Sequence, residues 1–332
     1  MKTLFLLFVC ATVIINFGTC TDTDDITTWE DFKEKYKRNY TGADDETRKN
    51  IFNINVENIK KHNEKFDKRE VTFKMGMNEF GDLTHSEFLN LFSVREIIQK
   101  DANVDTENDV LVFDDSGPLQ CDWRELKAVK TVHNQQACKS GWAYSAADAL
   151  AARYNISYNN SCDPLCARYF IKCSGGMGNN GCKGGLAFKA CELVNTTRVM
   201  PDENSFKNKD CKLDKMKNKV TLNIKDCVNR KHGYANISNE LCTNGPVSAS
   251  ISAEKPSFQF AKEGIYYEDD CEKTPNHQVL LVGYQIENSE NPYWIVKNSF
   301  GDSWGENGFL KISTKVSKSG CRIIGDVSFP VF

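Results

Sequence analysis

The segment Asn134-Gln-Gln-Ala-Cys-Lys-Ser-Gly-Trp142 decides the fold of this chain, together with what lies on either side of it. It leads into residues Ser140–Ala152, which are small, mostly apolar and helix-forming. Farther on, short β-rich runs are separated by turn residues: Val247–Ile251, Val279–Tyr284, Tyr293–Lys297 and Gly308–Ile312. A helical first half and a strand-rich second half predict an α+β fold of two lobes with a cleft between them.

The chain before this segment differs in cysteine content. Residues 26–95 contain no cysteine, whereas all twelve cysteines beyond residue 20 lie from Cys121 onward. Two sets of residues in this first part recur at helical spacing and predict amphipathic helices: Trp29, Phe32, Tyr36 and Tyr40, then Phe52, Val56, Ile59 and Asn63. Residues 97–118 are acidic and polar without periodicity, which predicts an exposed linker where a processing protease would cut.

The N-terminus is typical of a signal peptide over residues 1–20. Lys2 precedes an apolar run, Leu4–Phe17, and small residues follow it. A membrane anchor is the alternative, but a spanning helix needs roughly 20 apolar residues. We therefore expect a secreted protein without a membrane span, or one of a lysosomal or secretory-vesicle lumen. Five sequons predict surface glycans: Asn39, Asn155, Asn159, Asn195 and Asn236.

Composition excludes several classes of function. The formal net charge is −3 with both signs mixed along the chain, so no basic block predicts a nucleic-acid partner. The twelve cysteines predict disulfides in a secretory chain. The sequence has no pair of cysteines with two residues between them that is accompanied by a second such pair or by a pair of histidines, so we expect no metal site. We expect no cofactor, and a monomer.

Two motifs in the first part resemble the propeptides of papain-like cysteine proteases of the cathepsin L branch. The long-helix motif is matched by Asp44, Arg48, Phe52, Asn55, Ile59 and Asn63, with Asp44 where glutamate is usual. The second motif is matched by Gly76, Asn78, Phe80 and Asp82. The resemblance implies an inhibitory prodomain over residues 21–115 that runs through the cleft, followed by a papain-like domain over residues 116–332.

The second part resembles the protease domain of the same family. Asp122-Trp-Arg124 opens it, and residues 134–142 match the nucleophile segment. The resemblance places the catalytic histidine at His277, the asparagine that orients it at Asn298, and the oxyanion amide at Gln135. Its substrate-binding positions fall on Lys139, Trp142, Gly184, Gly185, Leu186, Gln278 and Trp304.

The nucleophile is the residue that the resemblance leaves unmatched. Peptide cleavage in this family requires a thiolate at the start of a helix, an imidazole and a group that orients it. Gly141 stands at the nucleophile position and has no side chain, so no acyl-enzyme can form. Neighbouring side chains on a helix point about 100° apart, so Ser140 would point away from His277. The family pattern places Cys138 in a disulfide. His277 acting alone on water would give residual rates at most.

The cleft departs from the family at further positions. Gln136 and Lys139 stand where the family has glycines, and the Lys139 side chain is expected to narrow the primary specificity cleft. Gln278 stands where a small residue usually follows the histidine, and Phe300 replaces a tryptophan that shields the His–Asn pair. Because several positions differ together, we interpret the chain as a natural inactive paralogue rather than one with its cysteine removed by design.

Several retained residues also have a purely structural interpretation. The His277–Asn298 hydrogen bond could persist only because it closes the interface between the lobes. Gly184 and Gly185 could persist because the turn needs positive φ. Trp142 and Trp304 are more typical of core residues than of ligand platforms.

Disulfide pairing follows from the resemblance alone. It implies Cys138–Cys182, Cys173–Cys211 and Cys271–Cys321. A weaker similarity to the mite group 1 allergens implies Cys121–Cys227, which leaves Cys162–Cys166 and Cys191–Cys242 by elimination.

Three functions remain open at this point. The first is a secreted pseudoprotease that binds peptides, cystatin-like inhibitors or host proteins, and the altered cleft favours binding through other surfaces. The second is a structural, storage or antigenic glycoprotein that uses only the stable fold. The third is a cysteine-type peptidase with residual activity.

Overall fold

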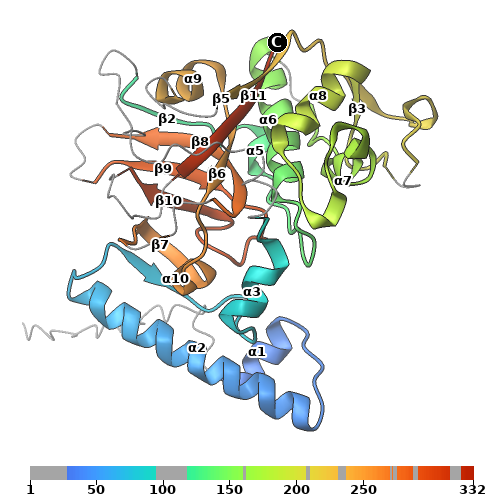
Figure 1. Cartoon of the computed structure of the whole chain (residues 1–332). Coiled ribbons are helices and arrows are strands. Elements are labelled where there is room, and N and C mark those ends of the chain that lie inside the picture. Colours follow the sequence, from blue (N-terminus) through green and yellow to red (C-terminus); the bar gives the residue numbers. More distant parts are fainter. Residues whose placement is uncertain are drawn as a thin grey trace, which may run out of the picture.

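The structure of the protein is a computed structural model that describes residues 28–94, 118–159, 162–206, 210–230, 237–269, 271, 275–286, 291–314 and 323–332. A lobe of helices lies beside a lobe built on a large sheet, and an N-terminal unit covers one end of the sheet lobe (Figure 1). The predicted signal peptide and nearly all of the predicted linker lie outside the described residues.

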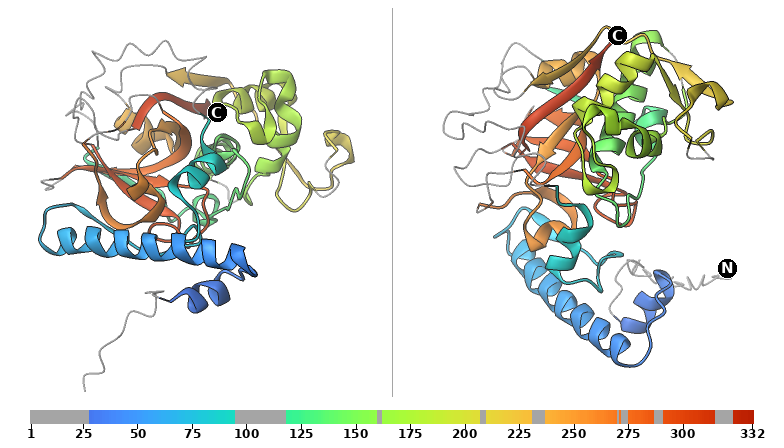
Figure 2. Two further views of the ribbon diagram at one scale, coloured as in Figure 1. Left: turned by 60° about the horizontal axis from the view of Figure 1, so that its bottom comes forward. Right: turned by 45° about the vertical axis from the view of Figure 1, so that its right-hand side comes forward.

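The helical lobe is organised around α6 (Gly141–Tyr158), which begins in the segment that decides the fold. Its many alanines and Leu150 are buried on nearly every side, as expected for a helix that is apolar all round. The other elements of this lobe are α5 (Lys127–Lys130), α7 (Ala167–Cys173), η1 (Ser174–Met177), η2 (Gly181–Lys183), α8 (Ala187–Thr197), η3 (Leu213–Lys215) and the antiparallel pair of β3 (Val199–Pro201) and β4 (Lys219–Thr221). Because α6 packs on α7 and α8 and also on β6 and β8, it forms the wall between the lobes (Figure 2).

The sheet lobe contains all four of the predicted β-rich runs as strands. These are β6 (Val247–Ile251), β8 (His277–Gln285), β9 (Tyr293–Lys297) and β10 (Phe309–Ser313). The sheet order is β1-β7-β10-β9-β8-β6-β11-β5, and β2 pairs with β8. The remaining elements are β1 (Phe73–Met75), β2 (Gln120–Asp122), β5 (Asp226–Arg230), β7 (Ala261–Tyr266), β11 (Ile323–Val331), α9 (Ile237–Asn244) and α10 (Pro256–Phe260).

The N-terminal unit contains the two predicted helices, α1 (Trp29–Lys35) and α2 (Ala43–Asp67), followed by β1 and α3 (His85–Phe92). Helix α1 ends before Tyr40, so the helix predicted from the aromatic spacing is longer than the observed one. Tyr40 nevertheless packs on Trp29, with ring centroids 6.0 Å apart, and its hydroxyl donates to Asp82. Aromatic packing thus explains a periodicity that continues beyond the helix.

The long-helix motif holds the N-terminal unit together. Asn55 donates to the carbonyl oxygens of Gly81 and Leu83 at 2.9 and 3.0 Å, and Asn63 exchanges two hydrogen bonds with the Met75 backbone. Arg48 makes a double contact with Glu87 at 2.9 Å. The other members lie near these contacts: Asp44 4.0 Å from Arg48, Phe52 in the small aromatic core, and Ile59 against the main core.

The second motif joins the N-terminal unit to the sheet lobe. Asn78 donates to the Gln259 carbonyl oxygen at 2.7 Å, and Gly76 donates its N–H to the Phe260 carbonyl oxygen at 2.9 Å. Asp82 accepts from Arg38 at 2.9 Å. Phe80 belongs to the hydrophobic core that the two parts share. The N-terminal unit therefore docks through the same residues that define its motif.

The disulfides agree with the prediction in part and correct it in part. Cys138–Cys182 and Cys173–Cys211 are present, and Cys271 is disulfide-bonded while its expected partner, Cys321, lies outside the described residues. The predicted Cys121–Cys227 and Cys191–Cys242 are wrong, because the structure joins Cys121–Cys242 and Cys191–Cys227. The predicted Cys162–Cys166 is also wrong, since both are free thiols.

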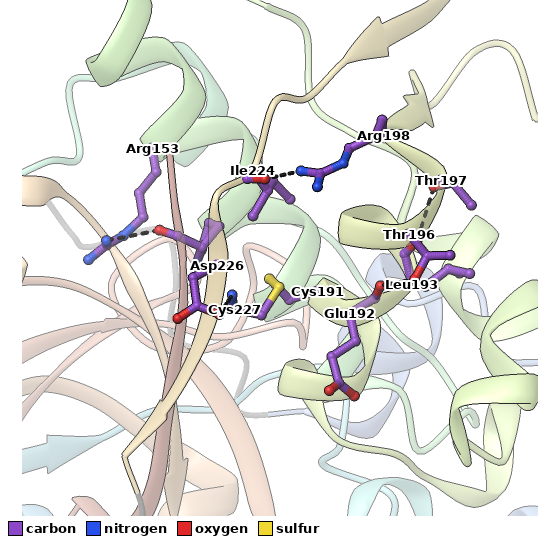
Figure 3. The surroundings of a disulfide bond; sticks show 11 residues. Arg153, Cys191, Glu192, Leu193, Thr196, Thr197, Arg198, Ile224, Asp226 and Cys227 are labelled. Carbon is purple, nitrogen blue, oxygen red and sulfur yellow. Dashed lines mark hydrogen bonds between the residues drawn. A yellow bond between two sulfur atoms is a disulfide. The ribbon is translucent and has the colours of Figure 1, made fainter.

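The topology explains the exchanged partners. Cys191 lies on α8, which packs directly on β5, where Cys227 is located (Figure 3). Cys121 lies on β2, which contacts α9 with Cys242. Each disulfide therefore joins neighbouring elements, a proximity that cysteine spacing alone does not reveal. Among the described residues, no helix is long and apolar enough to cross a membrane.

Candidate functional site

Gly141 is the first residue of α6 and lies where the two lobes meet. A β-carbon placed on it would lie 2.6 Å from His277 Cε1, 3.0 Å from His277 Nδ1 and 2.7 Å from the Gln278 carbonyl oxygen. All three neighbours come from the first two residues of β8 in the sheet lobe. The space that any side chain would need at position 141 is therefore already filled.

His277 and Asn298 form the predicted hydrogen bond, with 2.8 Å between Nε2 and Oδ1. His277 is 1% exposed, and burial lowers its pKa from 6.5 to about 4 although Asn298 opposes the shift. Phe300 stacks on the imidazole at 5.0 Å, while Phe92 of α3 meets it edge-on at 4.9 Å. This imidazole is neutral at pH 7.

The side chains beside Gly141 are committed to other contacts. Gln135 donates from Nε2 to the Cys138 carbonyl oxygen at 2.8 Å and accepts from the Ser299 hydroxyl at 2.6 Å. At most one of its amide hydrogens is thus left for an oxyanion. Ser140 is fully buried and its hydroxyl donates to the Cys138 carbonyl oxygen, while the Cys138 sulfur is in a disulfide.

Gln278 connects the lobes. Its side-chain oxygen accepts from the N–H of Ala187 at 3.2 Å, and its nitrogen donates to Ser250 Oγ at 3.2 Å. Ala187 is the first residue of α8, whose cap residue Leu186 provides no side-chain hydrogen bond. Gln278 therefore caps a helix of the opposite lobe and satisfies an N–H that helix geometry leaves unpaired. The side chain is 4% exposed, so it fills the space that it occupies.

The other predicted binding positions are mostly part of the core. Trp142 and Trp304 are 1% and 0% exposed, and Trp304 donates to the Phe258 carbonyl oxygen. Of the two glycines expected to need a positive φ, only Gly184 has one, at 116°. Gly185 is required by packing instead, because a β-carbon on it would lie 2.7 Å from the Trp142 ring. Lys139 is half-buried, and its N–H donates to the Cys182 carbonyl oxygen.

The N-terminal unit covers the site. After Phe92, Val94 donates its N–H to the Asn276 carbonyl oxygen at 2.9 Å, and its side chain forms a small buried cluster with Leu186. Phe92 also packs on Phe300 at 5.1 Å. The segment therefore contacts both lobes, as the resemblance implied for a prodomain that runs through the cleft.

Behind Gly141 lies a buried ion pair that sequence reasoning missed. Lys297 of β9 donates to Asp148 of α6 at 2.6 Å, and their side chains are 1% and 5% exposed. His133 lies 3.7 Å from Asp148 and 3.6 Å from Glu203. Asp148 is the one charged residue in the apolar stretch Ser140–Ala152. A single charge among apolar residues was the feature of the sequence that could have predicted a buried ion pair. A cavity of only about 10 Å³ remains between this pair and Gly141.

The sequons differ in accessibility. Asn39 and Asn159 are exposed, Asn195 is half-buried and Asn236 lies outside the described residues. Asn155 is 4% exposed and its side-chain oxygen accepts from the Cys162 N–H at 2.9 Å. The expectation of a surface glycan at Asn155 is therefore wrong, because its side chain faces into the fold. In the part of the chain that the structure describes, no cluster of three or more His, Cys, Asp or Glu could hold a metal ion.

Comparison with known proteins agrees with this geometry. Residues 117–331 match the model of the papain family cysteine proteases, and residues 29–88 match the cathepsin propeptide inhibitor domain. Digestive cysteine proteinase 3 of Homarus americanus is 34% identical over 310 residues, which cover 91% of this chain and 94% of that protein. A cathepsin L-like protein of Caenorhabditis elegans is 31% identical and covers 99% of this chain and 98% of its own length.

Solved structures show the same arrangement. Digestive procathepsin L 3 of Tenebrio molitor superposes with a TM-score of 0.75 at 28% identity, covering 92% of this chain and 98% of that one. The two-lobed fold and its N-terminal cover are therefore those of a procathepsin. With the matched domains spanning both parts of the chain, this protein belongs to the papain family of cysteine proteases and carries the family's propeptide inhibitor domain.

Proposed function

We propose that this chain is a secreted, non-proteolytic member of the papain family that acts by binding rather than by cleaving peptides. The observation that carries the proposal is that position 141 presents only backbone to His277, with no room for a β-carbon. The relatives named as proteinases belong to the same family, and we propose that their activity has been lost here.

No neighbouring group replaces the missing nucleophile. The Ser140 hydroxyl is buried against a carbonyl oxygen, and Cys138 is oxidised in a disulfide. In the full chain His277 is neutral and is covered by Phe300 and by Phe92 of the N-terminal unit, so it lacks the charge that stabilises a thiolate. A serine or water mechanism would need these contacts to break first.

The filled cleft favours partner binding through other surfaces. Gln278 occupies the space between α8 and β6, and Phe92 and Val94 occupy the opening above His277. In the full chain a peptide or a cystatin-like inhibitor would have to displace Phe92 and Val94, and after removal of the prodomain it would still meet the buried Gln278 side chain. A host or partner protein that binds outside the cleft would displace none of these side chains.

Turnover of a fluorogenic dipeptide tests the proposal. The linker is cut with an added protease, the prodomain is removed, and the protein is assayed beside an active papain-family enzyme. We expect no release of fluorophore above the buffer control. Turnover that disappears in His277→Ala would overturn the proposal, because it would identify His277 as a working base. A cystatin pull-down on the same preparation then separates binding in the cleft from binding elsewhere.

A further inference from the structure

Three aromatic side chains form a surface cluster where α6 ends. Tyr154 and Tyr158 lie one helical turn apart with ring centroids 5.0 Å apart, and Phe332 lies 5.9 and 6.0 Å from them. Tyr158 is 48% exposed, while Tyr154 and Phe332 are half-buried. Tyr158 is one of three large hydrophobic residues that are exposed in the described part of the chain, so its ring is a surface that another group could cover.

The residue that follows Tyr158 indicates what that group is. Asn159 ends α6 in a left-handed conformation, with φ 46° and ψ 47°, and it is exposed. In the sequence it begins the sequon Asn159-Asn-Ser161, of which the last two residues lie outside the described part of the chain. An attached sugar would thus start one residue from the most exposed ring of the cluster.

The structure also distinguishes Asn159 from the other sequon on the same helix. Asn155 lies one turn earlier, but it is 4% exposed and accepts a hydrogen bond from Cys162. A glycan on Asn155, which would be attached before the chain folds, could not be accommodated unless the end of α6 stayed open. Asn159 requires no such change, because the chain has already left the helix at this position.

We propose that Asn159 carries an N-linked glycan whose first sugar packs on the aromatic cluster of Tyr154, Tyr158 and Phe332. Nδ2 of Asn159 forms a bond to C1 of the sugar while the bond from C1 to the diphosphate oxygen of a lipid-linked oligosaccharide donor breaks. The lipid diphosphate leaves with the electron pair, and the amide loses one proton. The apolar C–H face of the sugar ring then covers the aromatic faces. The hydroxyl groups of the sugar stay in water, as does the hydroxyl of Tyr158.

Site occupancy is the first test. The full chain is produced in a eukaryotic secretory host, treated with peptide N-glycosidase in heavy-oxygen water, and sequenced by tandem mass spectrometry. We expect the label at Asn159 and not at Asn155, although both lie in one short stretch of chain. An unlabelled Asn159, or a labelled Asn155, overturns the proposal.

A double-mutant cycle tests the packing. Asn159→Asp removes the sequon but still tolerates the left-handed backbone, and Tyr158→Ala removes the exposed ring. We expect loss of the glycan to lower the midpoint of thermal unfolding by about 2 °C or more with Tyr158 present, and to leave it unchanged in Tyr158→Ala. Enzymatic deglycosylation of the unmutated chain gives the same comparison without relying on the variant.

The matched control is Asn39, an exposed sequon in the N-terminal unit that is not part of this cluster. Its removal by Asn39→Asp is expected to change the unfolding midpoint equally with and without Tyr158. Equal shifts for Asn159 in both backgrounds overturn the packing, and would instead leave the aromatic cluster as a surface for a protein partner.

Discussion

Alanine at position 141 is expected to destabilise the protein, which is the opposite of what glycine-to-alanine changes in helices ordinarily do. Replacing a helical glycine usually gains about 0.5–1 kcal/mol, because alanine loses less backbone entropy on folding. Here the new methyl group would lie 2.6 Å from the His277 ring and 2.7 Å from the Gln278 carbonyl oxygen. One of these neighbours is backbone within a paired strand, so it cannot rotate away.

The magnitude follows from the cost of overpacking. Inserting an extra carbon into a well-packed interior costs about 1–3 kcal/mol. After the gain from helix propensity is subtracted, we expect Gly141→Ala to lower the free energy of unfolding by about 1 kcal/mol, and by about 2.5 kcal/mol at most. Urea denaturation at pH 7, followed by tryptophan fluorescence, measures this difference.

Gly176→Ala is the matched control, because a β-carbon there meets nothing within 4 Å and its φ is not positive. Its stability should equal or exceed that of the unmutated chain. If Gly141→Ala behaves like Gly176→Ala, the lobes are not closed on Gly141 and the reasoning is refuted. Gly141→Cys extends the experiment: we expect it to be destabilised as well and to stay inactive, since restoring the sulfur does not restore the space for it.

Three further predictions concern protons, lobe contacts and disulfides. Burial lowers the pKa of His277 from 6.5 to about 4, so the contribution of the neutral imidazole to stability is complete above pH 6.5. As the pH falls from 6.5 toward 4, the free energy of unfolding should drop by roughly 3 kcal/mol. Unfolding measured as a function of pH, with His277→Phe for comparison, tests this. Gln278→Ala should lower the free energy of unfolding by about 2 kcal/mol, because the Ala187 N–H loses its partner and a cavity opens, as denaturant titration would show. Cys191→Ala with Cys227→Ala should lower it by roughly 4 kcal/mol on the chain-entropy account, and non-reducing peptide mapping should recover the Cys191–Cys227 peptide.

Each of these has a result that contradicts it. A pH profile that is the same with and without His277 would show that another group titrates in this range. Gln120→Ala, which changes an exposed glutamine, is the control for Gln278→Ala. If the two variants are equally stable, the hydrogen bonds of Gln278 between the lobes do not contribute to stability. A recovered Cys121–Cys227 peptide would restore the pairing first expected from the mite allergens.

Local patterns predicted the elements of the fold well, since each arises from residues close together in sequence. The four β-rich runs, the helix after Ser140 and the long helix with Asn55 and Asn63 depend only on periodicity and motif spacing. Disulfide partners were predicted less well, because Cys191 and Cys227 meet only once α8 has packed on β5.

The interior of the site could be predicted only in outline. The sequence places a glycine at position 141 and a glutamine after the histidine, but it does not show that the Gln278 carbonyl oxygen occupies the space for a β-carbon. Nor does it show that Gln278 caps α8 from the opposite lobe. Such contacts depend on how two lobes approach one another, which no local pattern records.

The pairing of β1 with β7 has a consequence for the chain once its N-terminal unit is gone. Thr72 and Gly76 supply backbone hydrogen bonds on either side of this pairing, and β7 lies next to the end of the sheet. Removal of residues 28–94 would leave β7 as a bare edge, with the apolar surface that had been under Phe73 and Met75 beside it. Bare edges of this kind recruit strands from other molecules. The N-terminal unit therefore covers an edge at which copies of the chain could otherwise pair, a role that does not depend on peptide cleavage.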